Sequence, residues 1–279
     1  MKMPRSIRID KMQAAGNDFV VVDDMRLAIS SPARRVALAR QLCHRQYGVG
    51  ADGLILIQPP ANGACAYRMR IINSDGSEAE MCGNGSRCAV KFAVENRIAP
   101  RAHAFETLAG VISGRYISSG VVRVSLTTPS GFRPGVTVRT RAGGALRGSF
   151  INTGVPHFVS FVPNLAAFNV RDVGAEIRLH KIFAPRGTNV NFVRIRGRSR
   201  IDVRTYERGV ESETLACGTG STASAIVAAL TRRLRPPISV RTSGGSDLLV
   251  DFTVAGPARV TDVTMQGPVE KVFETKVML

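Results

Sequence analysis

The sequence of 279 residues contains no apolar run approaching the length of about 18 that a membrane-spanning helix requires. Its first residues also lack an uninterrupted apolar core followed by a cleavage site, so we expect no signal peptide and a cytoplasmic protein. Hydrophobic residues make up 44% and charged residues 21% of the chain, which is typical of a folded globular protein. The length is sufficient for two ordinary domains.

Acidic residues are scarce as well, with 21 Asp and Glu against 38 Lys and Arg, and the formal net charge is +17. Such a charge attracts nucleic acids or anionic small molecules. The basic residues are nevertheless scattered, with short clusters only at 196–200 and 231–235. No basic tail or RNA-binding signature accompanies them. We expect a solvated basic surface and no specific nucleic-acid partner; a nucleic-acid-binding protein is the alternative from another class.

The chain has only five cysteines, Cys43, Cys65, Cys82, Cys88 and Cys217. An odd number in a cytoplasmic protein argues against a disulfide framework. The spacing of Cys82 and Cys88 does not match a zinc motif, and no second Cys/His pair follows, so we expect no metal. Cys43, Cys65 and Cys88 are expected to be small buried side chains.

The other two cysteines lie in a repeated element. MCGNGS at 81–86 returns as ACGTGS at 216–221, with the cysteines 135 residues apart (217 − 82). AAGNDFVVV at 14–22 likewise matches NTGVPHFVSFV at 152–162, and GVGADGLILI at 48–57 matches RGTNVNFVRI at 186–195. Because the order and approximate offset are kept, the pattern indicates a duplication, with two similar domains related by a pseudo-two-fold axis.

Each copy reads as an α/β unit. Alternating residues at 68–73 and 201–205 predict half-buried strands, and the apolar stretches 89–94 and 223–230 predict helices that run through the centre of each domain. Proline and glycine around 129–135 are expected to mark the boundary between domains 1–128 and 129–267, with 268–279 returning to the first domain. Further short strands are expected at 121–126, 238–242, 247–252 and 258–264.

In both copies a strand and a turn lead into Cys-Gly-x-Gly-Ser and then a helix. The glycines allow a tight turn and leave N–H groups available at the helix start, where the helix dipole favours an anion such as a carboxylate. The same position lowers the pKa of a thiol. The Gly-Lys-Ser/Thr of a Walker loop is absent, and no other cofactor motif is present, so we expect no cofactor.

Two such cysteines on opposite sides of one substrate would invert a stereocentre. One thiolate would remove a proton, and the opposite thiol would deliver one to the other face. N–H groups at the helix starts would stabilise the charge that develops on the substrate carboxylate. A redox pair and a pair of buried structural cysteines remain as alternatives for Cys82 and Cys217.

Several motifs resemble the diaminopimelate epimerase family: AGNDFVVVD (15–23), GADG (50–53), INSDGSEAEMCGNGSRC (72–88), NVNF (189–192), YERG (206–209) and ETLACGTGSTAS (213–224). The resemblance covers nearly the whole chain in order. It implies two pseudo-symmetric α/β domains, each a curved, mainly antiparallel sheet around a central helix. It also implies cofactor-independent conversion of LL-diaminopimelate to the meso isomer, for lysine and peptidoglycan synthesis, and a homodimer.

The resemblance also implies roles for individual residues. Cys82 and Cys217 match the catalytic bases, with His157 and Glu207 assisting. The matching backbone donors and substrate-binding groups are Asn17, Asn73, Gly83, Asn84, Asn191, Glu207, Arg208, Gly218 and Thr219.

Two positions depart from the family pattern. Val155 stands where many members have asparagine, and Gly53 stands where some have glutamine. Valine cannot form the hydrogen bonds of an amide, so recognition of the non-reacting end of the substrate is expected to differ. The nearest alternative is a proline racemase or hydroxyproline epimerase of the same fold, in which histidine is typical at the position of Asn84.

Overall fold

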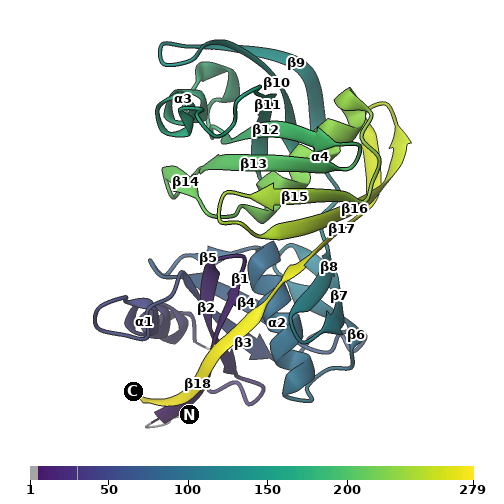
Figure 1. Cartoon of the computed structure of the whole chain (residues 1–279). Coiled ribbons are helices and arrows are strands. Elements are labelled where there is room, and N and C mark those ends of the chain that lie inside the picture. Colours follow the sequence, from purple (N-terminus) through teal and green to yellow (C-terminus); the bar gives the residue numbers. More distant parts are fainter. Residues whose placement is uncertain (1–5, 30) are drawn as a thin grey trace. The chain divides into compact units, whose positions relative to one another are not determined.

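A computed structural model describes residues 6–29 and 31–279 and divides the chain into two compact units, Met1–Ser125 with Gly267–Leu279, and Leu126–Gln266 (Figure 1). The last strand of the chain pairs antiparallel with the first strand. No helix among residues 6–29 and 31–279 is long and apolar enough to cross a membrane.

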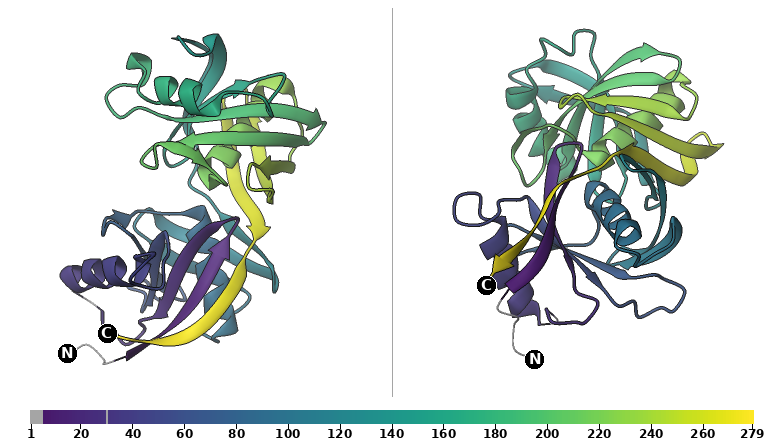
Figure 2. Two further views of the ribbon diagram at one scale, coloured as in Figure 1. Left: turned by 60° about the vertical axis from the view of Figure 1, so that its left-hand side comes forward. Right: turned by 60° about the horizontal axis from the view of Figure 1, so that its bottom comes forward.

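The first unit is one mixed sheet around a central helix. The strands follow the order β18-β1-β2-β3-β4-β6-β7-β8, with β5 paired beside β4. Only β2–β3 and β4–β6 are parallel among these pairs. Its elements are β1 (Ser6–Ala14), β2 (Asn17–Asp23), α1 (Pro32–Cys43), β3 (Gly53–Gln58), β4 (Arg68–Asn73), β5 (Glu78–Ala79), α2 (Gly83–Glu95), β6 (Ala102–Thr107), β7 (Gly110–Ser118), β8 (Val121–Ser125) and β18 (Glu270–Met278). In both views of Figure 2 the yellow β18 runs beside the purple β1.

The second unit repeats this plan, with the strand order β9-β10-β11-β12-β13-β15-β16-β17 and β14 paired beside β13. The two parallel pairs, β11–β12 and β13–β15, occupy the same places as in the first unit. Its elements are β9 (Ser130–Thr140), β10 (Gly144–Asn152), β11 (Pro156–Phe161), α3 (Val170–Arg178), the 3₁₀ turn η1 (Lys181–Phe183), β12 (Asn189–Gly197), β13 (Arg200–Glu207), β14 (Ser212–Thr214), α4 (Gly218–Arg232), β15 (Ile238–Thr242), β16 (Asp247–Gly256) and β17 (Arg259–Pro268).

The predicted fold class, α/β with duplicated domains, is confirmed by this correspondence. The segments that match in sequence form equivalent elements: the end of β1 and β2 match the end of β10 and β11, and β3 matches β12. Both first turns contain a glycine with positive φ, Gly16 at 86° and Gly154 at 106°, a conformation that glycine adopts without steric cost.

The central helices α2 and α4 are buried on nearly all sides. Helix α2 packs against β1, β2, β3, β4, β7 and β8, and α4 packs against β10, β11, β12, β13, β15 and β16. Such burial explains why both helices are apolar over most of their length, because no face remains for charged side chains. Arg87 and Lys91 on α2 are the buried exceptions.

The proline- and glycine-containing stretch 129–135, predicted to mark the domain boundary, is mostly strand. It begins β9, which pairs with β10 at the edge of the second sheet. The register shifts between the pairs Gly148↔Val136 and Phe150↔Arg133, so Pro134 and Gly135 lie in an irregular part of the ladder. An edge strand with such an irregularity accommodates proline, because its missing N–H leaves no ladder bond unmade.

Candidate active site

Cys82 ends the turn before α2 and is the N-cap residue of that helix. Its backbone is extended, with φ −142° and ψ 120°, and its Sγ accepts a hydrogen bond from the Gly85 N–H at 3.5 Å. The first backbone bond of the helix runs from the Ser86 N–H to the Cys82 carbonyl at 2.8 Å. The N–H groups of Gly83 and Asn84 therefore precede the helical ladder and are available to an anion.

The side-chain amides of Asn17 and Asn84 are each oriented by a partner that can only accept or only donate a hydrogen bond. Asn17 donates from Nδ2 to the Asp52 carboxylate at 2.6 Å, so its Oδ1 is the atom near Cys82 Sγ, at 3.7 Å. Asn84 accepts through Oδ1 from the Arg87 guanidinium at 2.8 Å, so its Nδ2 is the atom that lies 3.3 Å from Asn17 Oδ1. A carboxylate accepts only and a guanidinium donates only, so neither amide can be reversed without losing a bond.

Asp18 and Asp52 are each paired with a cation. Lys11 Nζ lies 2.5 Å from Asp18 Oδ2, and Arg45 Nη2 contacts Asp18 at 3.0 Å and Asp52 at 2.7 Å. Burial raises the pKa of Asp18, but hydrogen bonds and charges from Lys11 and Arg45 outweigh it and hold that pKa below its ordinary value. Asp52 therefore presents a carboxylate to Asn17 within a network that is close to neutral.

Asn73 and Gly53 face each other at the end of the β3–β4 ladder. Asn73 is exposed and donates to the Ser77 hydroxyl at 2.9 Å, so its amide can still reach a ligand. A side chain at Gly53 would be crowded, because a Cβ there would lie 3.0 Å from the Ile72 carbonyl oxygen and 3.5 Å from the Phe19 ring. Glycine thus brings β3 close to its neighbours at this point.

Cys217 has the equivalent place in the second unit. It is the N-cap residue of α4, and its Sγ accepts from the Gly220 N–H at 3.4 Å. Its Sγ also lies 3.5 Å from the Thr219 hydroxyl, and Thr153 donates to the Thr219 carbonyl at 3.0 Å. Gly218 and Thr219 therefore start α4 as Gly83 and Asn84 start α2, with N–H groups ahead of the ladder.

His157 and Asn191 are fully buried and hydrogen-bonded to each other in the second unit. The Asn191 Nδ2 donates to the Phe158 carbonyl at 3.0 Å and lies 3.1 Å from His157 Nδ1, while its Oδ1 accepts from Thr205 at 3.0 Å. An amide nitrogen only donates, so His157 Nδ1 accepts and Nε2 carries the proton. Within residues 6–29 and 31–279, Nε2 has no hydrogen-bond partner.

The charge state of this histidine follows from its surroundings. Burial, together with the charge of Arg208, lowers the pKa of His157 to about 3, against a partial rise from the Asn191 hydrogen bond. His157 is thus a neutral imidazole at physiological pH. Both ends of the Asn191 amide are used inside the protein, so its sequence-based role in contacting substrate stays a prediction.

Glu207 is the last residue of β13, and Arg208 follows it. Glu207 accepts from the Thr214 hydroxyl at 2.7 Å, and the Arg208 N–H donates to Asn189 Oδ1 at 2.8 Å. Burial and the charges of Arg178 and Arg186 lower the pKa of Arg208, which marks a locally cationic site. Asn189 was missed by the sequence reasoning. The available signal was its place in NVNF, two positions before Asn191 on the same face of β12.

The remaining cysteines are buried, as predicted. Burial raises the pKa of both Cys43 and Cys88 to about 12, and burial also raises that of Cys65. These thiols are therefore protonated at neutral pH and unsuited to act as bases.

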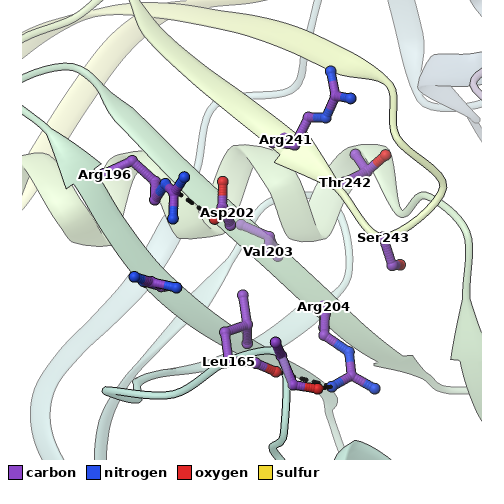
Figure 3. Close-up of a pocket in the computed structure, with 10 residues that line it drawn as sticks. Leu165, Arg196, Asp202, Val203, Arg204, Arg241, Thr242 and Ser243 are labelled. Atoms are coloured by element: carbon purple, nitrogen blue, oxygen red, sulfur yellow. Dashed lines mark hydrogen bonds and ion pairs between the residues drawn. The ribbon is translucent and has the colours of Figure 1, made fainter.

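The second unit also contains a surface hollow. Figure 3 shows its side chains, which come from β12, β13 and β15 and from residues 165–166. Three of its arginines are ion-paired: Arg196 with Asp202 at 3.5 Å, Arg204 with Glu213 at 2.7 Å and Arg241 with Asp247 at 2.8 Å. None of the predicted site residues lines this hollow, so it is not the candidate site.

The fold of this chain is shared with solved structures. One is a hydroxyproline epimerase from Agrobacterium vitis with bound trans-4-OH-L-proline, with a TM-score of 0.74 over 100% of this chain and 94% of that chain. The sequence identity is 17%, so this similarity shows the shared fold alone. The chain is thus a duplicated α/β protein of the fold found in that epimerase.

Sequence comparison is more specific. The family model described as Diaminopimelate epimerase matches residues 9–129 and 149–272. A diaminopimelate epimerase of Aquifex aeolicus is 48% identical over 271 residues, covering 95% of each chain, and one of Hydrogenobaculum sp. is 43% identical over 95% of this chain and 96% of the relative. The chain belongs to the diaminopimelate epimerase family.

Proposed function

We propose that this protein interconverts LL-diaminopimelate and meso-diaminopimelate, with Cys82 and Cys217 as the two bases. One observation carries the proposal: each unit places a cysteine as the N-cap of its central helix with the same glycine N–H bond to sulfur, at 3.5 Å and 3.4 Å. Family membership supports the choice of substrate. Burial raises the pKa of Cys43 and Cys88 to about 12, and these cysteines lack this setting.

In the proposed reaction, one thiolate removes the α-hydrogen and becomes a thiol. The C–H electron pair moves into the adjacent carboxylate, which takes on enediolate character. N–H groups at the helix starts, those of Gly83, Asn84, Gly218 and Thr219, stabilise this charge. The opposite thiol then delivers its proton to the other face and becomes a thiolate, so the configuration inverts while the enzyme keeps one thiolate and one thiol.

The remaining predicted residues divide between the two units. Asn17 and Asn73 would bind polar groups of the substrate from the first unit, and Arg208 would bind a carboxylate from the second. Glu207 and the neutral His157 would assist near the reacting centre. Val155 offers no amide at its position, so we propose that Asn189, which already contacts the Arg208 backbone at 2.8 Å, is part of the recognition of the distal end.

The experiment is an incubation of reduced protein with LL-diaminopimelate in D2O, followed by chiral separation and mass spectrometry. We expect the meso isomer with one deuterium at the inverted α carbon. Cys82→Ala and Cys217→Ala should each lower epimerisation by at least about 10³-fold, in the range for loss of a general base, whereas Cys65→Ala should retain it. Full turnover in both alanine variants would exclude the two-base mechanism, and turnover of proline instead would assign the chain to the alternative substrate class.

We further propose a cytoplasmic homodimer without a specific nucleic-acid partner. The family resemblance supports the dimer. The ion pairs of many arginines, such as Arg204 with Glu213, support a solvated basic surface. Sedimentation velocity should give twice the monomer mass of 30.0 kDa, and RNA binding should be absent at physiological salt. A monomer, or tight RNA binding at that salt, would contradict these expectations.

A further inference from the structure

Arg87 is a fully buried cation in the first turns of α2, with no exposed surface. Its Nη2 donates to Asn84 Oδ1 at 2.8 Å, its Nη1 lies 3.4 Å from the Gly83 carbonyl, and its Nε lies 3.4 Å from the Pro268 carbonyl. All three partners are neutral. None of the ion pairs formed by residues 6–29 and 31–279 includes Arg87.

A buried guanidinium without a carboxylate is costly, because desolvation of the charge is not offset by a counter-ion. Burial lowers the pKa of Arg87 to about 10, while the neighbouring Cys88 and Cys82 raise it, so the side chain remains charged at neutral pH. Cys88 is itself held protonated by burial. The anionic groups available to balance Arg87 are therefore the thiolate of Cys82 and an anion bound at the start of α2.

The duplicated helix has no such cation. Arg87 lies five residues after Cys82 (87 − 82), and the position five residues after Cys217 is Thr222 (222 − 217). The Thr222 hydroxyl is buried and donates to the Gly218 carbonyl of its own helix at 2.9 Å. The two cysteines share their N-cap geometry. They differ in the residue five positions later in the helix, which is the cation Arg87 after Cys82 and the neutral Thr222 after Cys217.

We propose that Arg87 is a positioning residue that makes the Cys82 half of the site cationic: it fixes the Asn84 amide and stabilises the anionic form of Cys82, so that the two cysteines are chemically unequal. This inference rests on the proposed function for its catalytic consequence. Its electrostatic part does not depend on any substrate. In the resting enzyme, Cys82 carries the thiolate more often than Cys217 does.

Other charged groups around Cys82 do not reverse this effect. Lys11 on β1 and Arg45 after α1 balance the carboxylates of Asp18 on β2 and Asp52 before β3. From β3 and β4, the side chains that close over the first turn of α2 are apolar, as the approach of Ile55 and Ile71 to Gly85 shows. On β4 and β5, Arg70 and Glu78 pair with each other at 2.8 Å.

Two further groups lie near Cys82, one in the preceding turn and one on β2. Glu80 is exposed in the turn before Cys82 and is screened by water. The Asn17 Oδ1, 3.7 Å from Sγ, favours the protonated thiol, but a long contact to sulfur is weaker than the field of a buried full charge. We therefore expect the removal of Arg87 to raise the pKa of Cys82, since the two groups are electrostatically coupled.

The test compares Arg87→Met, Arg87→Lys and the matched control Thr222→Val at the equivalent position of α4. Iodoacetamide labelling is followed across pH by peptide mass spectrometry, which reports Cys82 and Cys217 separately. We expect Arg87→Met to raise the labelling midpoint of Cys82 by about one pH unit or more, a shift typical of a lost neighbouring cation, and to leave that of Cys217 in place. Thr222→Val should change neither midpoint.

Steady-state kinetics distinguish the effect of the Arg87 charge from its effect on the orientation of the Asn84 amide. Arg87→Lys retains the charge but not the planar fork that holds Asn84, so the Cys82 midpoint should return towards wild type while KM stays raised severalfold. In Arg87→Met the acidic limb of the kcat/KM profile should move to higher pH along with the labelling midpoint. A purely structural role would lower activity without moving either pH dependence.

Three results would overturn the proposal: an unchanged Cys82 midpoint in Arg87→Met, equal shifts at both cysteines, or the same shift in Thr222→Val. If Arg87→Met does not fold, Arg87→Lys decides, because an unchanged KM with full activity would remove the positioning role. Failure of the proposed function is a distinct result, since absent deuterium exchange in the wild type would leave the labelling comparison intact.

Discussion

Asn17 donates to Asp52 through Nδ2 at 2.6 Å, and this bond decides which face of the amide meets Cys82. Asp52 bonds to the Nδ2 end of this amide, whereas Cys82 Sγ lies near the Oδ1 end. It acts on the site through the orientation of Asn17, in the way Arg87 acts through Asn84. The two amides are thus held at opposite ends by a carboxylate and a guanidinium, with their contact to each other in the middle at 3.3 Å.

Asp52→Asn should lower kcat/KM by about 10- to 100-fold, the range seen when a group that orients a site residue is replaced. The new amide can offer its own N–H to Asn17, which allows the Asn17 amide to reverse and present Nδ2 to Cys82. Steady-state kinetics with LL-diaminopimelate measure the loss. Asp247→Asn, at an exposed pair with Arg241, is the matched control and should retain activity. Equal activity in the two variants would show that the Asn17 orientation does not matter.

His157 should make the protein less stable in mild acid. Its pKa is about 3 in the folded chain and 6.5 in an unfolded one, so above pH 6.5 both states are neutral and the group has no effect. As pH falls from 6.5 towards 3, only the unfolded state takes up the proton, and the free energy of unfolding drops by up to about 1.4 kcal/mol per pH unit. Below about pH 3 the effect levels off.

Urea denaturation at pH 7, 6, 5 and 4 measures this dependence. His157→Gln lacks the titrating ring and should show a shallower loss of stability with acid, even where its stability at pH 7 is lower. His44→Gln, at an exposed histidine, is the control and should follow the wild-type slope. Parallel slopes for wild type and His157→Gln would mean that the imidazole is not buried in its neutral form.

Gly220→Ala and Gly85→Ala form a second matched pair, because these glycines hold equivalent places in the two helices. A Cβ at Gly220 would overlap the Oδ1 of Asn191, which is fully buried and hydrogen-bonded at both ends, and would lie 3.2 Å from Cys217 Sγ. A Cβ at Gly85 would meet the flexible tips of Ile71 and Ile55, at 3.1 Å and 3.3 Å.

We therefore expect Gly220→Ala to lower the free energy of unfolding by about 2–3 kcal/mol, as overpacking in a rigid core does. Gly85→Ala should cost less than about 1 kcal/mol, because the better helix propensity of alanine offsets the crowding. Chemical denaturation at pH 7 gives both values. Equal costs would imply that Asn191 moves aside as easily as an isoleucine methyl group.

The sequence predicts the duplication and the two helix-start cysteines well because both are local patterns: a short motif followed by an apolar run. The topology repeats this pattern, with β2–β3 and β11–β12 as the matching parallel pairs. The outer helices α1 and α3 were not predicted. Their arginines interrupt the apolar periodicity, although Ser31-Pro32 before α1 is a helix-start signal.

Other features depend on tertiary packing that no local pattern contains. Pro134 lies in the stretch predicted to mark the domain boundary, and no strand was predicted there; the edge position of β9 and its irregular register accommodate this proline within a strand. Asn189 and Asn191 look alike in sequence, yet the first meets the Arg208 backbone and the second bonds with His157. Arg87 is one of many arginines in the chain, and composition places arginine on the surface. Only the packed sheet around α2 makes it the buried cation of the site.

The pairing of β18 with β1 has a consequence for biosynthesis. Unit 2 is one continuous segment, Leu126–Gln266, so all of its strands can be translated before the last residues of the described chain exist. Unit 1 starts earlier but needs Glu270–Met278 to cover β1, from Ser6 opposite Met278 to Gln13 opposite Glu270. During translation, β1 therefore lacks its β18 partner until the last residues have been made, and one edge of the first sheet stays unpaired. We expect nascent chains stalled before residue 270 to aggregate more readily than the full chain.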